Sequence, residues 1–155
     1  MAAMSHLIIA RHALAEPSGH VDRERDLTQT GHEQAAALGA WLREQKLKVD
    51  YAIVSDALRT QQTFSDLQIQ CEVLTTDQAY NASAGALAAL VRSAPANARC
   101  VLLIGHNPGV FDLAAGYGYF GGMTPASAAV CELAGMPAQF GSLHATVTLS
   151  FQPAA

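Results

Sequence analysis

Cys100-Val-Leu-Leu-Ile-Gly-His-Asn-Pro-Gly109 is the stretch of this sequence that says most about the fold. Its first five residues predict a buried strand, because a short apolar run bounded by turn residues is typical of a parallel sheet. Gly105 suits a tight turn, Asn107 is a helix N-cap residue, and Pro108 fits the first helical position. The stretch therefore predicts a strand that turns sharply into a helix.

The same alternation of strands and helices is found along the rest of the chain. Residues 6–10 predict another buried strand, and a helix is expected from Thr28 to near Lys46, with Thr28 and Thr30 as competing N-caps. Further strands are expected at 50–54, 71–75, 129–133 and 144–151, and further helices at 55–67, with Ser55 as N-cap, and at 84–92. Apolar and polar residues alternate along the last strand, as in a half-exposed antiparallel or edge strand.

This order of elements predicts an α/β fold. We expect a three-layer sandwich in which a mostly parallel central sheet, with one antiparallel or edge strand, carries helices on both faces. No repeat, low-complexity tract or linker interrupts the 155 residues, so one domain is expected to span residues 1–155.

The composition argues against several classes of function. Only 14% of the residues are charged, and 13 acidic against 9 basic residues give a net charge of −4, whereas a protein that binds nucleic acid through phosphates needs a basic excess. No apolar run approaches the roughly 20 residues of a membrane helix, and no secretory signal is evident. Cys71, Cys100 and Cys131 are odd in number and widely spaced, which indicates reduced core residues. We therefore expect a cytoplasmic protein without a nucleic-acid or membrane partner.

Cationic residues and histidines follow three of the predicted strands. Arg11 and His12 come directly after the first strand and His106 after the strand at 100–104, while Arg59 stands in the first turn of the helix at 55–67. The carboxyl ends of parallel strands meet at one edge of the sheet, where such folds bind ligands. The sequence thus predicts a cationic pocket at this edge.

A phosphoryl group is the ligand that such a pocket suits best. Arginine forks match phosphate oxygens, and helix N-termini add backbone N–H donors. His12 is the expected nucleophile, because a neutral imidazole nitrogen attacks phosphorus and neighbouring arginine charge disfavours the imidazolium form. No paired histidines at helical spacing and no carboxylate cluster are present, so neither a metal nor another cofactor is expected.

Each of these features also has an interpretation without function. An Arg-His pair after a strand is commonly part of a solvated loop, Arg59 alone suits a helix surface, and Gly105-His-Asn-Pro-Gly109 alone is a good turn. Their joint occurrence at successive strand ends favours a site. The other histidines, which have no such setting, are His6, His20, His32 and His144.

Four motifs follow one another along the chain. They are Ile9-Ala-Arg-His-Ala13, Asp26-Leu-Thr-x-x-Gly31, Ser55-Asp-Ala-Leu-Arg-Thr-x-Gln-Thr63 and Gly105-His-Asn-Pro-Gly109. Together they resemble the histidine phosphatase superfamily, which also contains the cofactor-dependent phosphoglycerate mutases. The similarity spans nearly the whole chain and is greatest to the SixA-like phosphohistidine phosphatases. The resemblance implies that His12 is the phosphorylated nucleophile and that Arg11, Arg59 and His106 hold the phosphoryl oxygens.

The chain also departs from the family pattern. Ala13 replaces a common glycine, and Asp56 replaces the usual proline and places a carboxylate near the pocket. The glutamate acid of larger members has no clear counterpart, although Asp77, Tyr80 and Asn81 lie in the corresponding segment. An imidazole leaves more easily than an alkoxide, so an acid contributes less when the substrate is phosphohistidine.

The sequence therefore leads to one main hypothesis and two alternatives. The main hypothesis is a metal-independent phosphatase that acts on a phosphohistidine-bearing signalling or phosphocarrier protein and releases inorganic phosphate. The loops 13–26 and 116–125 are expected to border the pocket mouth and to select this partner. The alternatives are a phosphatase for small phosphomonoesters, and a phosphate-binding interaction module without catalysis.

Overall fold

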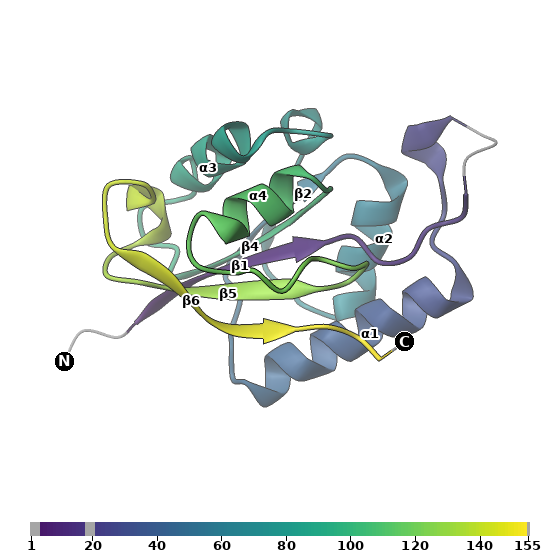
Figure 1. Cartoon of the computed structure of the whole chain (residues 1–155), viewed down its shortest axis with the longest axis horizontal. Helices are drawn as coiled ribbons and strands as arrows, with labels where there is room; N and C mark the ends of the chain where they lie inside the picture. The colour runs from purple at the N-terminus through teal and green to yellow at the C-terminus, as the bar shows by residue number, and fades with distance from the viewer. Residues whose placement is uncertain (1–3, 18–20, 155) are drawn as a thin grey trace.

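Six strands form one mixed sheet in the computed structural model, which describes residues 4–17 and 21–154 (Figure 1). The strand order is β3-β2-β4-β1-β5-β6. The strands are β1 (Ser5–Arg11), β2 (Tyr51–Ser55), β3 (Glu72–Thr76), β4 (Cys100–Gly105), β5 (Ala128–Leu133) and β6 (Ala145–Phe151). The helices are α1 (Gln29–Glu44), α2 (Leu58–Leu67), α3 (Ala84–Arg92) and α4 (Gly109–Ala115), with 3-10 turns η1 (Asp22–Glu24), η2 (Asp77–Ala79) and η3 (Pro137–Gln139).

The directions of the strands agree with the predicted sheet. β1, β4, β2 and β3 pair in parallel, while β5 pairs antiparallel with both β1 and β6. β6 therefore runs in the same direction as β1, and β5 is the strand that runs against the others in the part of the chain that the structure describes. The mostly parallel sheet with β6 as an edge strand is confirmed.

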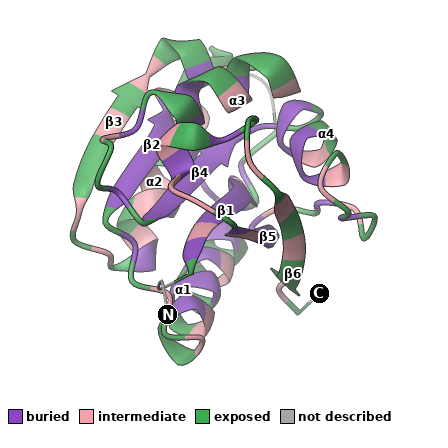
Figure 2. Cartoon of the chain, turned by 90° about the vertical axis from the view of Figure 1, so that its left-hand side faces the viewer, coloured by how far each residue is buried: buried purple, intermediate pink, exposed green. Residues whose placement is uncertain are grey.

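Helices cover both faces of the sheet, as predicted (Figure 1). Alternate residues of a strand point to opposite faces. In β1, Leu7 and Ile9 pack in one core with residues of α3 and α4, whereas Ile8 and Ala10 pack in a second core with residues of α1 and α2. The central strands are therefore buried on both faces (Figure 2), which explains why their sequences are continuously apolar.

Two predicted helix caps are wrong, and both errors concern residues beside the strand ends. Ser55 is the last residue of β2, and α2 begins three residues later. Asn107 does not cap α4, which begins at Gly109 after Pro108; instead its Nδ2 donates to the carbonyl oxygen of Met123. Of the two competing caps of α1, Thr28 is correct, because its hydroxyl accepts from the backbone N–H of Gly31.

Gly31 holds the loop after β1 against the first turn of α1. A Cβ at this position would lie 2.1 Å from the carbonyl oxygen of Leu14, so no side chain fits there without moving the backbone. We expect Gly31→Ala to lower the free energy of unfolding by about 1–3 kcal/mol, the usual cost of overpacking a well-packed site. Urea unfolding measures this change. Gly85→Ala on α3, where a Cβ meets its nearest neighbour at 4.0 Å, is the control, and an equal effect of both substitutions would contradict the prediction.

Within residues 4–17 and 21–154, no helix combines the length and the apolar character required to cross a membrane.

Candidate active site

The sheet topology brings His12 and His106 together. β1 and β4 are neighbours, with Arg11 opposite Gly105, so the two histidines directly follow paired residues. Their ring centroids lie 5.3 Å apart. β1 leads to α1 on one face and β4 to α4 on the other, and such a point of divergence is where open α/β sheets bind ligands.

His12 presents an unprotonated nitrogen. Its Nδ1 lies 2.7 Å from the carbonyl oxygen of Ala13, which only accepts hydrogen bonds, so the proton resides on Nδ1 and Nε2 keeps its lone pair. The residue is only 7% exposed. Burial lowers the pKa of His12 to about 3, and the charges of Arg11 and Arg59 act in the same direction, although the bond to Ala13 opposes the shift. The imidazole is therefore neutral at physiological pH.

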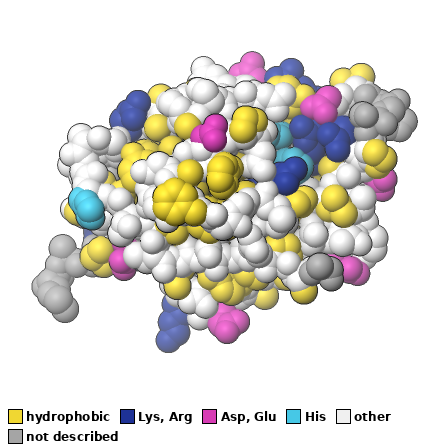
Figure 3. Space-filling view, in the orientation of Figure 1, with side chains coloured by type: hydrophobic (Ala, Val, Ile, Leu, Met, Phe, Trp, Pro, Cys, Tyr) yellow, Lys and Arg dark blue, Asp and Glu magenta, His cyan; other side chains and the backbone are white. Residues whose placement is uncertain are grey.

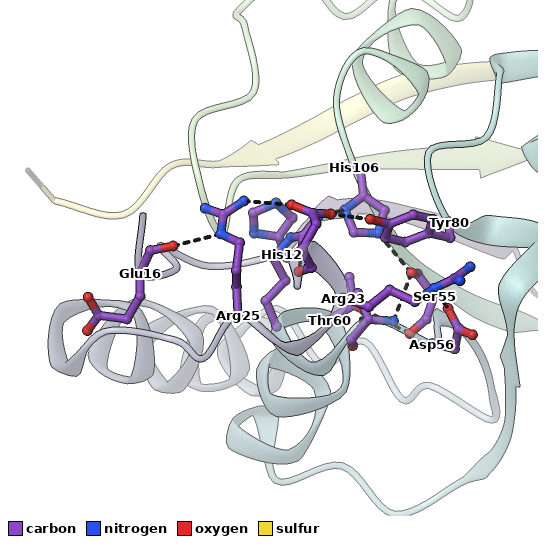
Figure 4. A network of polar contacts seen from close by, with 12 residues as sticks. His12, Glu16, Arg23, Arg25, Ser55, Asp56, Thr60, Tyr80 and His106 are labelled. Carbon is purple, nitrogen blue, oxygen red and sulfur yellow. Dashed lines mark hydrogen bonds and ion pairs between the residues drawn. The ribbon is translucent and has the colours of Figure 1, made fainter. Parts of the chain in front are cut away.

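His106 is held between Arg59 and Ser55. Arg59 Nη2 lies 3.3 Å from His106 Nδ1 and, because a guanidinium only donates, Nδ1 is the acceptor. The proton of His106 is then on Nε2, which donates to Ser55 Oγ at 2.8 Å. Burial first, and then the charge of Arg59, lower the pKa of His106 to about 4. Figure 4 shows His12, His106 and Ser55 in this cluster.

Arg11 and Arg59 each leave a buried donor without a partner. Arg11 Nη1 donates to Met123 O at 3.1 Å, and Arg59 donates to the carbonyl oxygen of Asp22 at 2.8 Å and to its carboxylate at 3.1 Å. The Nε atom of each arginine is buried without a hydrogen-bond partner among the described residues. Buried N–H donors are rarely left unsatisfied in proteins, so these two indicate a site for an anionic ligand.

The structure therefore brings all four predicted site residues together. They lie at the carboxyl ends of β1 and β4 and in the first turn of α2, and Figure 3 shows Lys or Arg and His side chains grouped on this part of the surface. His32 instead pairs with Asp66, with 2.6 Å between Nδ1 and Oδ2, His6 lies in the first half of β1 and His144 is exposed. His20 lies outside the described residues.

Asp22 and Tyr80 are the additional polar residues of this site. The Asp22 carboxylate accepts hydrogen bonds from Arg59, Arg25 and the Tyr80 hydroxyl. The Tyr80 ring meets the His106 ring edge-on at 5.3 Å, and the Arg23 guanidinium lies 4.1 Å from its centroid (Figure 4). The sequence indicates Tyr80 as one of three polar candidates in its segment, whereas Asp22 belongs to a run of alternating charges that is typical of a surface loop.

The other candidates for an acid or a perturbing charge are placed differently. Asp77 is exposed in η2, and Asn81 is exposed with a φ of 51°. The Asp56 carboxylate accepts from Arg23 Nε at 3.2 Å. The negative charge that Asp56 brings near the pocket is therefore paired with Arg23.

The remaining residues of the motif in α2 fix the loop that carries His12. Thr63 Oγ1 accepts from the backbone N–H of Ala13 at 2.9 Å and donates to the carbonyl oxygen of Arg59 at 2.7 Å. Gln62 accepts from the backbone N–H of Leu27 at 2.8 Å. Helix α2 therefore binds the loop near its start, at Ala13, and near its end, at Leu27, and the first turn of the same helix carries Arg59.

The depressed histidine pKa values predict that the protein is less stable in acid. The unfolded chain binds protons at His12 and His106 below about pH 6.5, whereas the folded chain does not do so until about pH 3 to 4, so the free energy of unfolding falls with pH in this window. Between about pH 7 and pH 5, we expect the free energy of unfolding of His12→Gln, measured in urea, to fall by about 1–2 kcal/mol less than that of the wild type. His144→Gln, at an exposed position, is the control, and an equal loss in His12→Gln would contradict the prediction.

Comparisons with known proteins agree with this geometry. The family model described as histidine phosphatase superfamily (branch 1) matches residues 7–103. The uncharacterized protein Rv1276c of Mycobacterium tuberculosis is 31% identical over 105 residues, which cover 67% of this chain and 66% of that protein, just under two thirds of its length.

Solved structures extend the likeness to the whole chain. A Nakamurella multipartitia protein, described provisionally as the phosphohistidine phosphatase SixA, superposes with a TM-score of 0.90 at 27% identity and covers 99% of both chains. The protein histidine phosphatase SixA complexed with tungstate has the same fold, with a TM-score of 0.82 at 23% identity over 96% of this chain and 97% of that one.

Proposed function

The chain belongs to the histidine phosphatase superfamily, and we propose that it hydrolyses phosphohistidine on a partner protein, through a phosphohistidine formed on His12. The observation that carries this proposal is that His12, whose Nε2 keeps its lone pair, lies in the field of two arginines that each have an unsatisfied buried Nε donor. The similarity at 27% identity to a protein described as a phosphohistidine phosphatase supports the choice of substrate.

The proposed reaction has two steps. His12 Nε2 attacks the phosphorus, the P–N bond of the substrate breaks, and its electron pair stays on the imidazole that leaves. Arg11 and Arg59 hold the phosphoryl oxygens where negative charge develops, and His106, bonded to Arg59 and Ser55, positions Arg59 beside them. Water then attacks the phosphorus of the phosphorylated His12, so that inorganic phosphate leaves and the neutral His12 side chain is regenerated. The arginines supply the positive charge in this mechanism, so we expect full activity in the presence of EDTA.

A macromolecular substrate is supported by apolar side chains on the segments that meet the site. Among the described residues, six large hydrophobic side chains are exposed. Three of them belong to segments in contact with site arginines: Leu14 and Val21 in the loop with Asp22, and Phe120 in the loop with Met123. Phe120 is 81% exposed and lies three residues, at most about 11 Å of chain, from Met123. Exposed aromatic side chains such as Phe120 are enriched in protein-binding surfaces.

Phe120 provides a test for protein binding. We expect Phe120→Ser to lower kcat/KM for a phosphohistidine protein by about tenfold, the loss of one buried aromatic contact, and to leave kcat/KM for a small phosphoester unchanged. Val73→Ser at the β3 edge is the matched control. If both substrates respond alike to Phe120→Ser, Phe120 does not bind the partner.

The decisive experiment for the proposed function is a comparison of substrates. The protein is incubated with phosphohistidine-bearing proteins and with a panel of phosphate esters, and released phosphate is measured. A higher kcat/KM for the phosphohistidine proteins supports the proposal. A preference for a sugar phosphate or nucleotide makes the chain a small-molecule phosphomonoesterase, and vanadate binding without turnover makes it a phosphate-binding module.

A further inference from the structure

The Asp22 carboxylate is in contact with a proposed catalytic arginine. Its Oδ2 lies 3.1 Å from Arg59 Nη2 and also accepts the Tyr80 hydroxyl, while its Oδ1 lies 3.2 Å from Arg25 Nη1. Its backbone carbonyl oxygen accepts a further bond of 2.8 Å from Arg59 Nη1. Four hydrogen bonds thus fix a negative charge beside the group that is expected to hold a dianion.

Asp22 is the solvent-exposed partner of Arg59 in this site. The attacking and leaving atoms of a phosphoryl transfer lie roughly in line, so the leaving group points away from the buried His12 and toward solvent. The Asp22 side chain is 46% exposed, whereas that of Arg59 is 5% exposed. Asp22 and Tyr80 therefore line the outer part of the site, where the second half of a substrate must lie.

A carboxylate at this place has opposite effects on two substrate classes. The hydrogen bonds from Tyr80, Arg25 and Arg59 keep the pKa of Asp22 below its usual range, so that it is ionised and accepts hydrogen bonds but has no proton to donate. An alkoxide leaving group needs a proton, which this carboxylate does not provide. An N-phosphorylated imidazole instead carries an N–H on its second nitrogen in its cationic form, and a carboxylate stabilises this N–H and its positive charge.

We propose that Asp22 is the specificity-determining residue of this site, which binds the second ring nitrogen of the phosphorylated imidazole and so selects phosphohistidine over phosphate esters. The inference rests on the proposed phosphatase function. When the phosphoryl oxygens engage Arg59, the Asp22 carboxylate accepts the N–H of the substrate ring.

No proton transfer is required in this reaction. The bond between His12 Nε2 and phosphorus forms, the P–N bond of the substrate breaks, and the released electron pair neutralises the imidazolium. The ring leaves as neutral imidazole and keeps its N–H. This explains how the enzyme would act without the acid that larger members of the family use.

Two small substrates test the proposal without contributions from protein docking. kcat/KM is measured for phosphoimidazole, which has a P–N bond, and for p-nitrophenyl phosphate, an ester whose leaving group needs no acid. We expect Asp22→Asn to lower kcat/KM for phosphoimidazole by about tenfold or more relative to the value for the ester, the effect of losing one charge-assisted hydrogen bond. Any loss that acts through Arg59 lowers both values equally and leaves their ratio unchanged. The deficit of Asp22→Asn should shrink as the pH falls and the substrate ring becomes protonated in solution. Glu24→Gln, on the same η1 turn, removes an equal charge and serves as the matched control.

The possible outcomes separate this inference from the proposed function. An equal loss for both substrates in Asp22→Asn shows that Asp22 only positions Arg59, and overturns the inference while phosphohistidine turnover by the wild type stands. A loss for the ester alone shows that Asp22 favours esters over the P–N bond, and overturns the inference as well. If the wild-type protein hydrolyses only the ester, the proposed function fails first, and the inference fails with it.

Discussion

His12→Ala is expected to abolish turnover of every phosphorylated substrate. Nε2 of His12 is the nucleophile in the proposed mechanism, and removing the nucleophile of a covalent mechanism commonly lowers kcat by on the order of 10⁴-fold or more. The same substitution should eliminate the phosphoenzyme. Brief incubation with a ³²P-labelled substrate, followed by alkaline denaturation and gel electrophoresis, detects this acid-labile intermediate.

His106→Ala is the informative comparison for His12→Ala. Like His12, His106 is buried and lies near Arg59. Its Nε2 is bonded to Ser55 and its Nδ1 to Arg59, so neither nitrogen is placed to attack. This variant should still form a phosphoenzyme, at a lower rate. A phosphoenzyme in His12→Ala, or a phosphate label on another residue, would rule out His12 as the nucleophile.

The positions of the proposed catalytic residues could be predicted because they follow from the backbone. Arg11, His12 and His106 are attached to strand ends, and parallel strands with apolar sequences meet at one edge of a sheet. Residues 84–92 were predicted as a helix with the bounds that α3 has in the structure. In these cases local sequence and tertiary structure favour the same conformation.

The contacts of Ser55, Asn107 and Asp22 could not be predicted, because each depends on a partner distant in sequence. Serine and asparagine before a helix are ordinary caps, yet here Ser55 Oγ binds His106 and Asn107 Nδ2 binds the backbone of Met123. Asp22 is 37 residues from Arg59 and 58 from Tyr80. A run of alternating charges has the composition of a solvated loop, and nothing local shows that one of its carboxylates contacts a buried arginine.

Arg59→Met is expected to have the second largest effect on activity, because Arg59 makes several hydrogen bonds in the site in addition to supplying a positive charge. It donates to His106 Nδ1 and twice to Asp22, and its Nε is one of the two buried unsatisfied donors. Removing one preorganised donor to a developing negative charge commonly lowers kcat by about 10²–10³-fold, and Arg59 contributes several. We therefore expect kcat/KM to fall by on the order of 10³-fold or more, and inhibition by vanadate to weaken in parallel.

Arg59→Lys separates the charge of this residue from its geometry. Lysine keeps the positive charge but has one ammonium group in place of a planar fork, so it cannot bind His106, Asp22 and a phosphoryl oxygen at the same time. Its activity should recover only about tenfold from that of Arg59→Met. The matched control is Arg92→Met, at an exposed arginine in the last turn of α3. Full activity in Arg59→Lys would mean that a point charge suffices, and the hydrogen bonds that join Arg59 to His106 and Asp22 would then have no part in catalysis.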